Sequence, residues 1–218
     1  MSINTHNLVI QRGKKVSESF QLSVPDLNIH TNEFWWLKGE SGSGKSSLLL
    51  TVAGLLVPSS GDLTVCSNAL TTLSETERDA FRGQNVGMVF QDHQLFDELN
   101  ALENLLVAVR FGQQRSTDAT DLELARHLLN EVGLGNKEAA KPRELSLGQQ
   151  QRIAVARAMM NRPKLLLVDE PTASLDQKNT EAVTELIQTF AEQEEMTVLF
   201  STHDLNLIPQ GSKQVICL

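Results

Sequence analysis

Residues 39–46 have the sequence Gly39-Glu40-Ser41-Gly42-Ser43-Gly44-Lys45-Ser46, which matches the pattern G-x-x-x-x-G-K-S/T. Glycines at this spacing let backbone N–H groups turn toward phosphate oxygens, and the helix expected to follow adds its N-terminal dipole. We expect Lys45 to reach the β- and γ-phosphates of a nucleotide, Ser46 to bind Mg²⁺, and Ser47 to contact the α-phosphate. The alternative, an ordinary glycine-rich turn before a helix, is disfavoured by the full match.

Four apolar runs predict buried parallel strands, and each ends at polar residues suited to phosphate or metal chemistry. The runs are Phe34–Leu37, Val86–Phe90, Leu165–Val168 and Val198–Phe200. They lead, in that order, into the phosphate loop, Gln91, Asp169 with Glu170, and Ser201-Thr202-His203. In open α/β sheets, ligands bind beyond the carboxyl ends of the strands. The four ends together therefore indicate one nucleotide site.

Two acidic residues, Asp169 and Glu170, follow the third run. Adjacent residues on an extended chain point in opposite directions. We therefore expect Asp169 to serve Mg²⁺ through water, and Glu170 to polarise the water that attacks the nucleotide. Taken without the phosphate loop, the two acids could equally form a solvated turn.

The segment Leu145–Arg152 predicts a capped helix start. Ser146 and Gln149 have the spacing of a capping box, in which each side chain satisfies a free N–H of the other residue. A capped start followed by Gly148 also presents bare backbone N–H groups, which form an anion site. The expected anion is the γ-phosphate held by a different subunit.

The remaining patterns predict an α/β domain with two additions. Helical spacing over Leu99–Val109, Leu122–Val132 and Leu147–Met160 indicates a helical insertion, with a loop over Gln113–Thr120. Alternating stretches at Leu8–Ile10, Phe20–Val24 and Leu63–Val65 indicate a small antiparallel sheet, and Gln214–Leu218 a last strand. The expected single domain, residues 1–218, divides into a core with the β subdomain at about 1–91 and 162–218, and a helical subdomain at about 92–161.

Composition narrows the possible partners. The 218 residues carry a formal net charge of -8, which disfavours sequence-independent binding of nucleic acid. The two cysteines, Cys66 and Cys217, form no disulfide framework or metal cluster. The longest apolar stretch, Leu48–Val57, is too short to span a bilayer. We expect a cytosolic protein whose contact with a membrane would come through a partner.

These motifs together resemble those of ABC transporter ATPases, across essentially the whole chain. The motifs are the phosphate loop, Gln91, Leu145–Gln149, Leu166–Glu170, Ser174-Leu175-Asp176 and His203. The resemblance implies a P-loop NTPase core and a head-to-tail homodimer with two ATP molecules between the subunits. It implies that Gln91 contacts Mg²⁺ and water, and that His203 touches the γ-phosphate. Ser146, Gly148, Gln149 and Asp176 are implied to act across the dimer interface.

A narrower resemblance links the chain to the ATPases of lipoprotein-release, macrolide-export and peptide-resistance systems. It rests on the phosphate loop and on Leu99-Asn100-Ala101-Leu102-Glu103-Asn104. It implies an ATPase on the inner face of the membrane, bound to a separate permease. The competing reading is a soluble ABC protein that acts on ribosomes or chromosomes. A P-loop kinase or GTPase is disfavoured by the segment Leu145–Gln149.

Two departures from the family pattern are present. The family has glycine where this chain has Leu147; Gly148 remains, and we expect function to survive. The family also stacks adenine on a tyrosine upstream of the phosphate loop, whereas this chain contains no tyrosine. Gln11 or Arg12 falls near that place, and an arginine plane can stack on a base.

Overall fold

The computed structural model of the protein describes residues 2–12, 20–173 and 175–218. Ser174, part of the family resemblance, lies outside the described residues.

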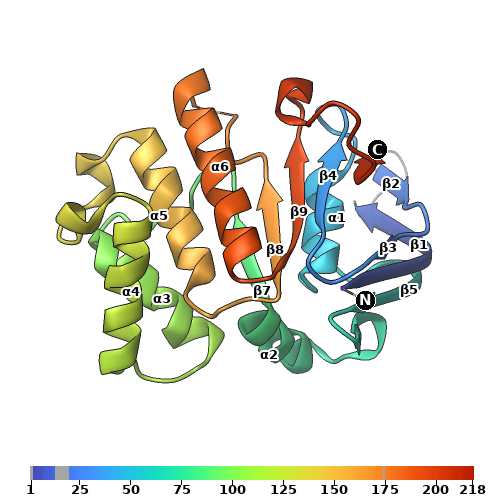
Figure 1. The fold of residues 1–218 in the computed structure, drawn as a ribbon. Helices are drawn as coiled ribbons and strands as arrows, with labels where there is room; N and C mark the ends of the chain where they lie inside the picture. Colours follow the sequence, from blue (N-terminus) through green and yellow to red (C-terminus); the bar gives the residue numbers. More distant parts are fainter. Residues whose placement is uncertain (1, 13–19, 174) are drawn as a thin grey trace.

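A parallel sheet forms the centre of the molecule (Figure 1). Its strands lie in the order β10-β4-β9-β8-β7, and each neighbouring pair is parallel. The bounds are β4 Phe34–Lys38, β7 Val86–Val89, β8 Leu165–Asp169, β9 Thr197–Thr202 and β10 Val215–Cys217. The four predicted strands and the predicted last strand are all present, with ends that differ by two residues at most.

A second, antiparallel sheet lies at one side of the molecule, at the right in Figure 1. Its path is β2-β1-β5-β6, and β3 also pairs with β1. The bounds are β1 Ile3–Arg12, β2 Phe20–Ser23, β3 Asn28–Ile29, β5 Ser60–Val65 and β6 Asn68–Ala69. The three predicted alternating stretches fall on β1, β2 and β5. The helix that follows the phosphate loop, α1 (Lys45–Val52), lies between the two sheets.

Both faces of the parallel sheet are buried, because successive side chains of each strand point to opposite sides. Leu165 and Leu167 of β8 join a core cluster with α1 and the antiparallel sheet. Leu166 and Val168 join a second cluster with the helices on the other face. Burial on both faces explains why these strands have continuous apolar sequences rather than alternating ones.

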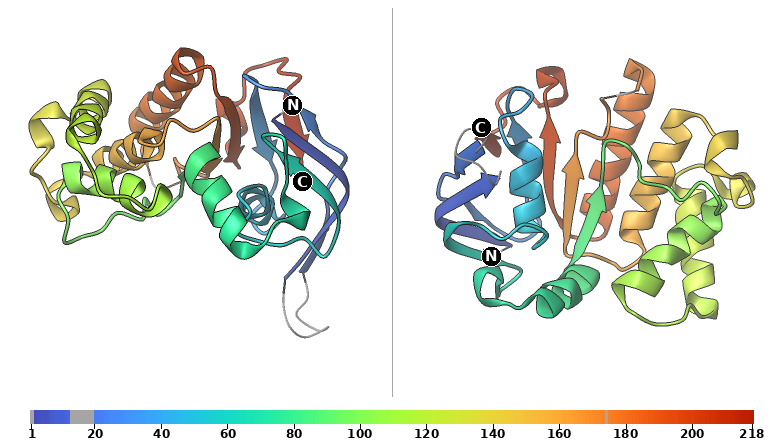
Figure 2. Two further views of the ribbon diagram at one scale, coloured as in Figure 1. Left: turned by 90° about the horizontal axis from the view of Figure 1, so that it is seen from below. Right: turned by 180° about the vertical axis from the view of Figure 1, so that it is seen from behind.

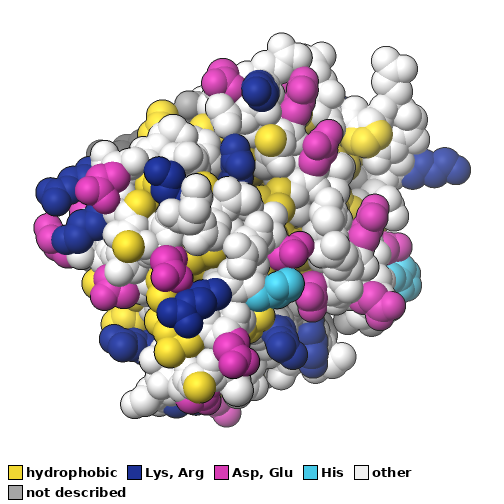
Figure 3. Space-filling model, turned by 60° about the vertical axis from the view of Figure 1, so that its left-hand side comes forward, with side chains coloured by type: hydrophobic (Ala, Val, Ile, Leu, Met, Phe, Trp, Pro, Cys, Tyr) yellow, Lys and Arg dark blue, Asp and Glu magenta, His cyan; other side chains and the backbone are white. Residues whose placement is uncertain are grey.

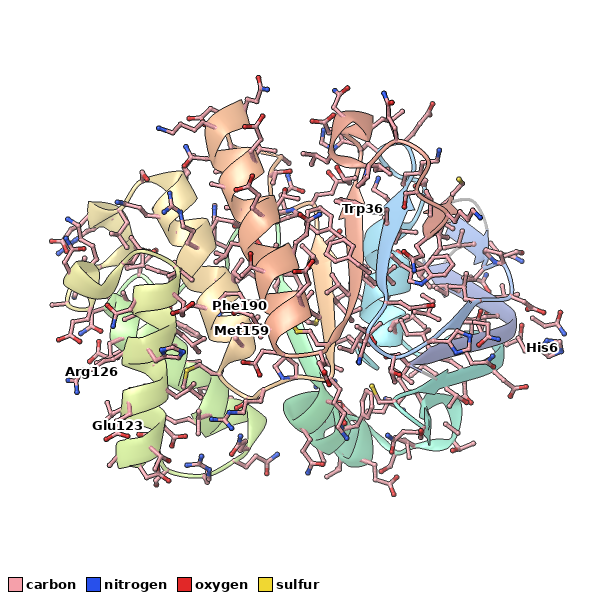
Figure 4. The ribbon with its side chains drawn as sticks, viewed as in Figure 1. His6, Trp36, Glu123, Arg126, Met159 and Phe190 are labelled. Atoms are coloured by element: carbon pink, nitrogen blue, oxygen red, sulfur yellow. The ribbon has the colours of Figure 1, made fainter. Side chains whose placement is uncertain are left out.

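Helices α5 (Leu147–Met159) and α6 (Gln177–Gln193) cover the second face of the sheet. Met159 of α5 and Phe190 of α6 lie near one another in this layer (Figure 4) and belong to the same core cluster. Burial of such side chains contributes about 1.5–3 kcal/mol each. The packing fixes α5, which begins at the predicted anion site, against the central sheet.

Helices α3 (Ala101–Gly112) and α4 (Ala119–Glu131) pack on α5 at the end of the molecule opposite the antiparallel sheet (Figure 2). Helix α2 (Glu75–Asn85) precedes β7. The capping residues Ser74, Asn100 and Asp118 begin α2, α3 and α4, each with a capping box. Short 3₁₀ turns occupy Leu70–Thr72, Gly135–Lys137, Pro142–Glu144 and Leu205–Leu207.

The α/β fold class and the three predicted insertion helices are confirmed, with shifted ends. Helix α3 starts at Ala101 rather than Leu99 because Asn100 is its cap. The predicted loop over Gln113–Thr120 is too long, because Asp118 caps α4 and its last two residues are helical. Helices α2 and α6 and the short strands β3 and β6 were not predicted. None of the helices in the described part of the chain is both long and apolar enough to cross a membrane.

Candidate functional site

A cavity of about 460 Å³ lies at the carboxyl ends of the parallel strands. Residues from five separate parts of the chain line it: the end of β1, the start of β2, the phosphate loop with α1, the segment just after β7 and the segment just after β8. The lining residues are Arg12, Phe20, Ser41, Gly42, Gly44, Lys45, Ser46, Ser47, Gln91 and Glu170. The fold thus gathers most of the predicted phosphate-binding residues around one space.

Two glycines give the phosphate loop its shape. Gly42 has φ 83° and Gly44 has φ 107°, both in the left-handed region that glycine adopts without strain. Gly44 is also the N-cap of α1. A Cβ atom at Gly44 would lie 2.8 Å from the Phe20 ring, so a larger residue there would clash as well as strain the backbone. The loop therefore ends directly at a helix N-terminus, which favours an anion.

Lys45 is the buried cation of the cavity, with only 4% of its surface exposed. Its ammonium group donates to the carbonyl oxygens of Gly39 and Glu40, each at 2.9 Å. It also lies 3.0 Å from Glu170 Oε1. The backbone of the loop and the acid at the end of β8 thus hold the lysine at the cavity wall.

Glu170 lies between Lys45 and His203. Its Oε2 is 2.9 Å from His203 Nδ1, so both carboxylate oxygens contact nitrogen atoms. Partial burial alone would raise the pKa of Glu170, but the hydrogen bonds from Lys45 and His203 outweigh burial and hold the pKa below its ordinary value. Glu170 also has φ 43°, a strained backbone conformation of the kind found at functional sites. The carboxylate stays ionised at neutral pH, as a group that polarises water must.

Ser201 connects the two acids, and the sequence did not predict this role. Its fully buried hydroxyl donates to Asp169 Oδ1 at 2.9 Å and accepts the N–H of Glu170 at 3.0 Å. The parallel register of β8 and β9 pairs Asp169 with Ser201. One hydroxyl therefore orients the predicted metal carboxylate and the backbone of the predicted base.

The far side of the cavity carries Arg12 and Phe20, which face each other across the β1–β2 pair. Arg12 is one of the two residues predicted to contact a base. Gln11 is exposed and is absent from the described residues that line the cavity. Phe20 was not predicted as a site residue. A signal was available, because antiparallel pairing of β1 with β2 places Phe20 opposite Arg12.

The residues predicted to act across a dimer lie away from this cavity. Ser146, Gly148, Gln149 and Asp176 are not among the described residues that line it. Ser146 and Gln149 form the predicted capping box of α5, with contacts of 3.0 and 3.3 Å. Asp176 caps α6 by accepting the N–H of Asn179 at 2.8 Å. The predicted capping box of Ser146 and Gln149 is confirmed, and the cap at Asp176 was not predicted. Contact of these four residues with nucleotide stays a prediction.

Leu147 departs from the family pattern without disturbing this helix start. The side chain is 50% exposed and follows the capping residue Ser146. Gly148 beside it is buried, and a Cβ atom there would lie 2.5 Å from Asn179 Oδ1. A larger residue at 148 would therefore have to displace the Asn179 side chain of α6.

A separate groove of about 500 Å³ runs between the core and the helical insertion. Leu55, Phe96 and Phe111 line it and are exposed by 45%, 49% and 74%. Gln94 and Arg157 are also in its wall. An apolar groove of this kind, rimmed by polar groups, is typical of a protein-binding surface.

Comparison with known proteins identifies relatives that match most of the chain. A family model described as ABC transporter matches residues 22–173. The lipoprotein-releasing system ATP-binding protein LolD of Hydrogenovibrio crunogenus is 40% identical over 189 residues, which are 87% of this chain and 81% of that protein. LolD of Shewanella denitrificans is 39% identical over 215 residues, 99% of this chain and 91% of that protein.

Solved structures indicate the same family as the relatives found by sequence. The dimeric ATP-binding cassette MJ0796, in a post-hydrolysis state bound to ADP and Pi, superposes with a TM-score of 0.88. It is 32% identical, and the match covers 99% of this chain and 94% of that one. By sequence and by fold, the chain belongs to the ABC transporter family, in which it is an ATP-binding subunit with ATPase activity.

Proposed function

We propose that this ATPase drives a separate membrane permease of the lipoprotein-release type, which extracts lipoproteins or peptides or exports a substrate. Its LolD relatives, at 38–40% identity over 87–99% of the chain, support this choice within the family. The observation that supports the catalytic role is that Glu170 contacts both Lys45 and His203 at the phosphate loop. The protein acts on the cytoplasmic face of the membrane, through its permease.

The residues of the cavity have distinct roles in hydrolysis. Backbone N–H groups of the loop Gly39–Ser46 and the N-terminus of α1 bind the phosphates, with Ser47 at the α-phosphate. Lys45 places its charge on the β- and γ-phosphates. Glu170 orients and polarises the attacking water, and His203, already bonded to Glu170, contacts the γ-phosphate.

The donor set also fits Mg²⁺. Ser46, Gln91 and Asp169 offer hydroxyl, amide and carboxylate oxygens, and Mg²⁺ is bound by a few protein oxygens together with water and substrate phosphates. Ser46 and Gln91 line the cavity, and neither side chain is engaged in a hydrogen bond with another described residue. When bound, Mg²⁺ neutralises charge on the phosphate oxygens, while Ser201 keeps Asp169 oriented.

The second half of the ATP site comes from another copy of the chain. Ser146, Gly148 and Gln149 stand at the start of α5, away from the cavity of their own subunit, and so does Asp176 at the start of α6. A head-to-tail homodimer brings them to the γ-phosphate of the facing subunit. The dimeric structures of MJ0796 support this arrangement.

The base of ATP lies against Arg12 and Phe20, which supply the stacking surface in place of a tyrosine. Both line the cavity from the β1–β2 pair, whereas Glu170 lines it from the end of β8. An arginine plane and an aromatic ring both stack on bases with little sequence preference. Gln11, exposed and outside the cavity lining, has no direct part.

The permease binds where the two parts of the domain meet. We assign about 1–91 and 162–218 to the nucleotide-binding core and about 92–161 to the helical subdomain. The groove with Phe96 and Phe111 lies where these parts meet, and its apolar wall suits a helix of the permease. The segment 92–99 runs from Gln91 directly into this groove.

The alternative is an ABC protein that acts on ribosomes or chromosomes. Such partners select for basic surfaces, whereas this chain has a net charge of -8. On the face that Figure 3 shows, basic and acidic side chains are intermixed. The charge distribution therefore favours the permease and disfavours nucleic acid.

Co-expression with lipoprotein-release permease subunits from the same genome tests this function. We expect a detergent-stable complex and an ATPase rate that rises in it. A Phe96→Asp, Phe111→Asp variant should lose the complex and keep basal ATPase activity. Arg126→Met, on the exposed side of α4 (Figure 4), serves as the control. Elution of the ATPase alone at an unchanged rate would contradict the proposal, as would cofractionation with ribosomes.

A further inference from the structure

The segment Phe90–Gln94, hereafter the sensor segment, lies between the two functional surfaces of the molecule. Gln91 within it lines the nucleotide cavity. Phe90 and Gln94 line the groove between core and helical insertion. A displacement of this segment would therefore change the walls of both the cavity and the groove.

The backbone of the sensor segment is strained at two consecutive residues. His93 has φ 60° and Gln94 has φ 48°, and neither is glycine. Left-handed conformations at such residues persist only where the surroundings hold them. The side chains that hold this pair therefore determine the position of the segment.

Arg157, in the last turn of α5, contacts both strained residues. Its Nη2 donates to the carbonyl of His93 at 2.8 Å, and its Nη1 donates to the carbonyl of Gln94 at 2.5 Å. No carboxylate among the described residues forms an ion pair with Arg157, so these carbonyls are its main partners. The planar fork of a guanidinium can bridge two acceptors at once, which a lysine ammonium on a flexible stem cannot reproduce.

Helix α5 contacts the sensor segment at further points along its length. Gln151, fully buried, donates to the carbonyl of Phe90 at 3.4 Å. Burial lowers the pKa of His93, and hydrogen bonds from its ring to the backbone of Asp92 and Leu147 oppose that fall. Helix α5, which follows the cap Ser146, is thus joined to the segment that contains Gln91 through Gln151 and Arg157.

The following residues are anchored separately. Asn104 of α3 is fully buried, accepts the N–H of Phe96 at 2.8 Å and donates to the carbonyls of Phe96, Leu99 and Asn100. The chain beyond the sensor segment is therefore held by α3. Among the side chains that the structure describes, Arg157 is the one that hydrogen-bonds to the carbonyls of residues 93 and 94.

We propose that Arg157 is a positioning residue for ATP hydrolysis: it holds the sensor segment on α5 and thereby holds Gln91 in the cavity. Arg157 also lines the groove between the core and the helical insertion. A partner bound in that groove would therefore lie beside the hydrogen bonds from Arg157 to the sensor segment. The inference rests on the proposed function, because it takes Gln91 as a contact of Mg²⁺ and water. Arg157 itself touches neither nucleotide nor metal.

Steady-state kinetics of the purified full chain with MgATP test this role. Arg157→Met should lower kcat by about ten- to a hundred-fold, the scale for misplacing a catalytic group, and leave the KM for ATP within about three-fold. Arg157→Lys, which keeps the charge but not the fork, should fall between wild type and Arg157→Met. Arg126→Met, which removes an exposed arginine of α4, should match wild type.

Hydrogen exchange distinguishes positioning from a purely structural effect. In both Arg157 variants, amides of residues 91–94 should exchange faster, while the amide of Phe96, which Asn104 holds, and those of β8 and α3 keep their protection. A wild-type kcat in Arg157→Met, or a loss confined to KM, would overturn the proposal. Unfolding of both variants, or loss of protection throughout the helical layer, would assign Arg157 to stability and overturn it equally. If wild-type protein hydrolyses ATP in the same assay, these failures leave the proposed function intact.

Discussion

Lys45 and Glu170 are in direct contact: the lysine ammonium lies 3.0 Å from a carboxylate oxygen of the glutamate. With the carbonyls of Gly39 and Glu40, this gives Lys45 three oxygen partners, the full capacity of an ammonium group. A γ-phosphate must therefore compete with Glu170 for the lysine. That competition would couple phosphate binding to release of the carboxylate that acts on water.

Removing the lysine should stop catalysis. Lys45→Ala loses the charge that faces the phosphates, and we expect hydrolysis to fall by at least about a hundred-fold, the scale for removing one group that stabilises the transition state. ATP binding should weaken as well. Phosphate release and nucleotide binding by fluorescence measure the two effects, with the exposed Lys213→Ala as control. A normal rate in Lys45→Ala would refute the assignment of the phosphate site.

Ser201 offers a test of orientation rather than charge. Ser201→Ala removes the hydroxyl that joins Asp169 to the backbone of Glu170. We expect kcat to fall by about ten-fold, because a hydrogen bond to a charged group contributes about 1.5–3 kcal/mol, while ATP affinity changes little. Ser59→Ala, at an exposed hydroxyl, is the matched control. An unchanged kcat would show that the acids do not depend on this hydroxyl.

Much of this site could be predicted from sequence because its groups follow buried strands directly. The continuous apolar sequences of β4, β7, β8 and β9 reflect burial on both faces, and the polar residues after them necessarily meet at one edge. Ser201 is different, because its partner is set by the register between two strands far apart in sequence. Phe20 likewise reaches the cavity only through its pairing with Arg12.

Helix α6 was not predicted because the apolar spacing in its sequence is weak. Its buried face combines Val183, Ile187 and Phe190 with the threonines Thr180 and Thr184. This stripe is narrow and partly polar, because the helix covers the sheet with one side only. The cap Asp176 and the spacing of the three apolar residues were nonetheless available as signals. Tertiary packing, rather than local preference, makes this a 17-residue helix.

The base of the nucleotide should be bound by stacking. Phe20→Ala and Arg12→Ala should each weaken ATP and GTP to a similar degree, about ten-fold, because stacking on a side chain contributes about 1–3 kcal/mol for any base. Gln11→Ala should have no effect. Competition binding with both nucleotides measures this. A strong preference for ATP that survives both substitutions would mean that the base lies elsewhere.

The ion pair between Asp121 and Arg115 at the start of α4 should make the free energy of unfolding depend on pH. Asp121 is buried and accepts two hydrogen bonds from Arg115, at 2.6 and 2.8 Å. These bonds hold the pKa of Asp121 below its ordinary value. A lowered pKa stabilises the fold above the pKa of the unfolded chain, and the effect is lost as pH falls through the folded value.

Asp121→Asn should therefore cost about 1–3 kcal/mol at pH 7 and progressively less as the pH falls below about 4. Urea unfolding at several pH values measures the difference. Glu138→Gln, in the exposed pair with Arg126, should cost no more than about 1 kcal/mol. A cost for Asp121→Asn that does not vary with pH would contradict the assigned ion pair.

Glu170→Gln is the most direct test of the proposed catalytic site and dimer, because it separates hydrolysis from binding. The amide keeps the shape of the side chain but cannot polarise water, so hydrolysis should fall by about two orders of magnitude or more. Lys45, Ser46 and Asp169 remain, so MgATP should still bind. The γ-phosphate should then hold two subunits together between Lys45 of one and Ser146 and Gly148 of the other.

Light scattering of Glu170→Gln with MgATP, with ADP, and with Ser146→Arg added is the decisive measurement. We expect a dimer with MgATP, a monomer with ADP, and a monomer with MgATP when Ser146→Arg blocks the shared phosphate. A dimer that forms equally with ADP, or that survives Ser146→Arg, would contradict the shared ATP site; turnover of ATP by Glu170→Gln at the wild-type rate would contradict the catalytic role of Glu170.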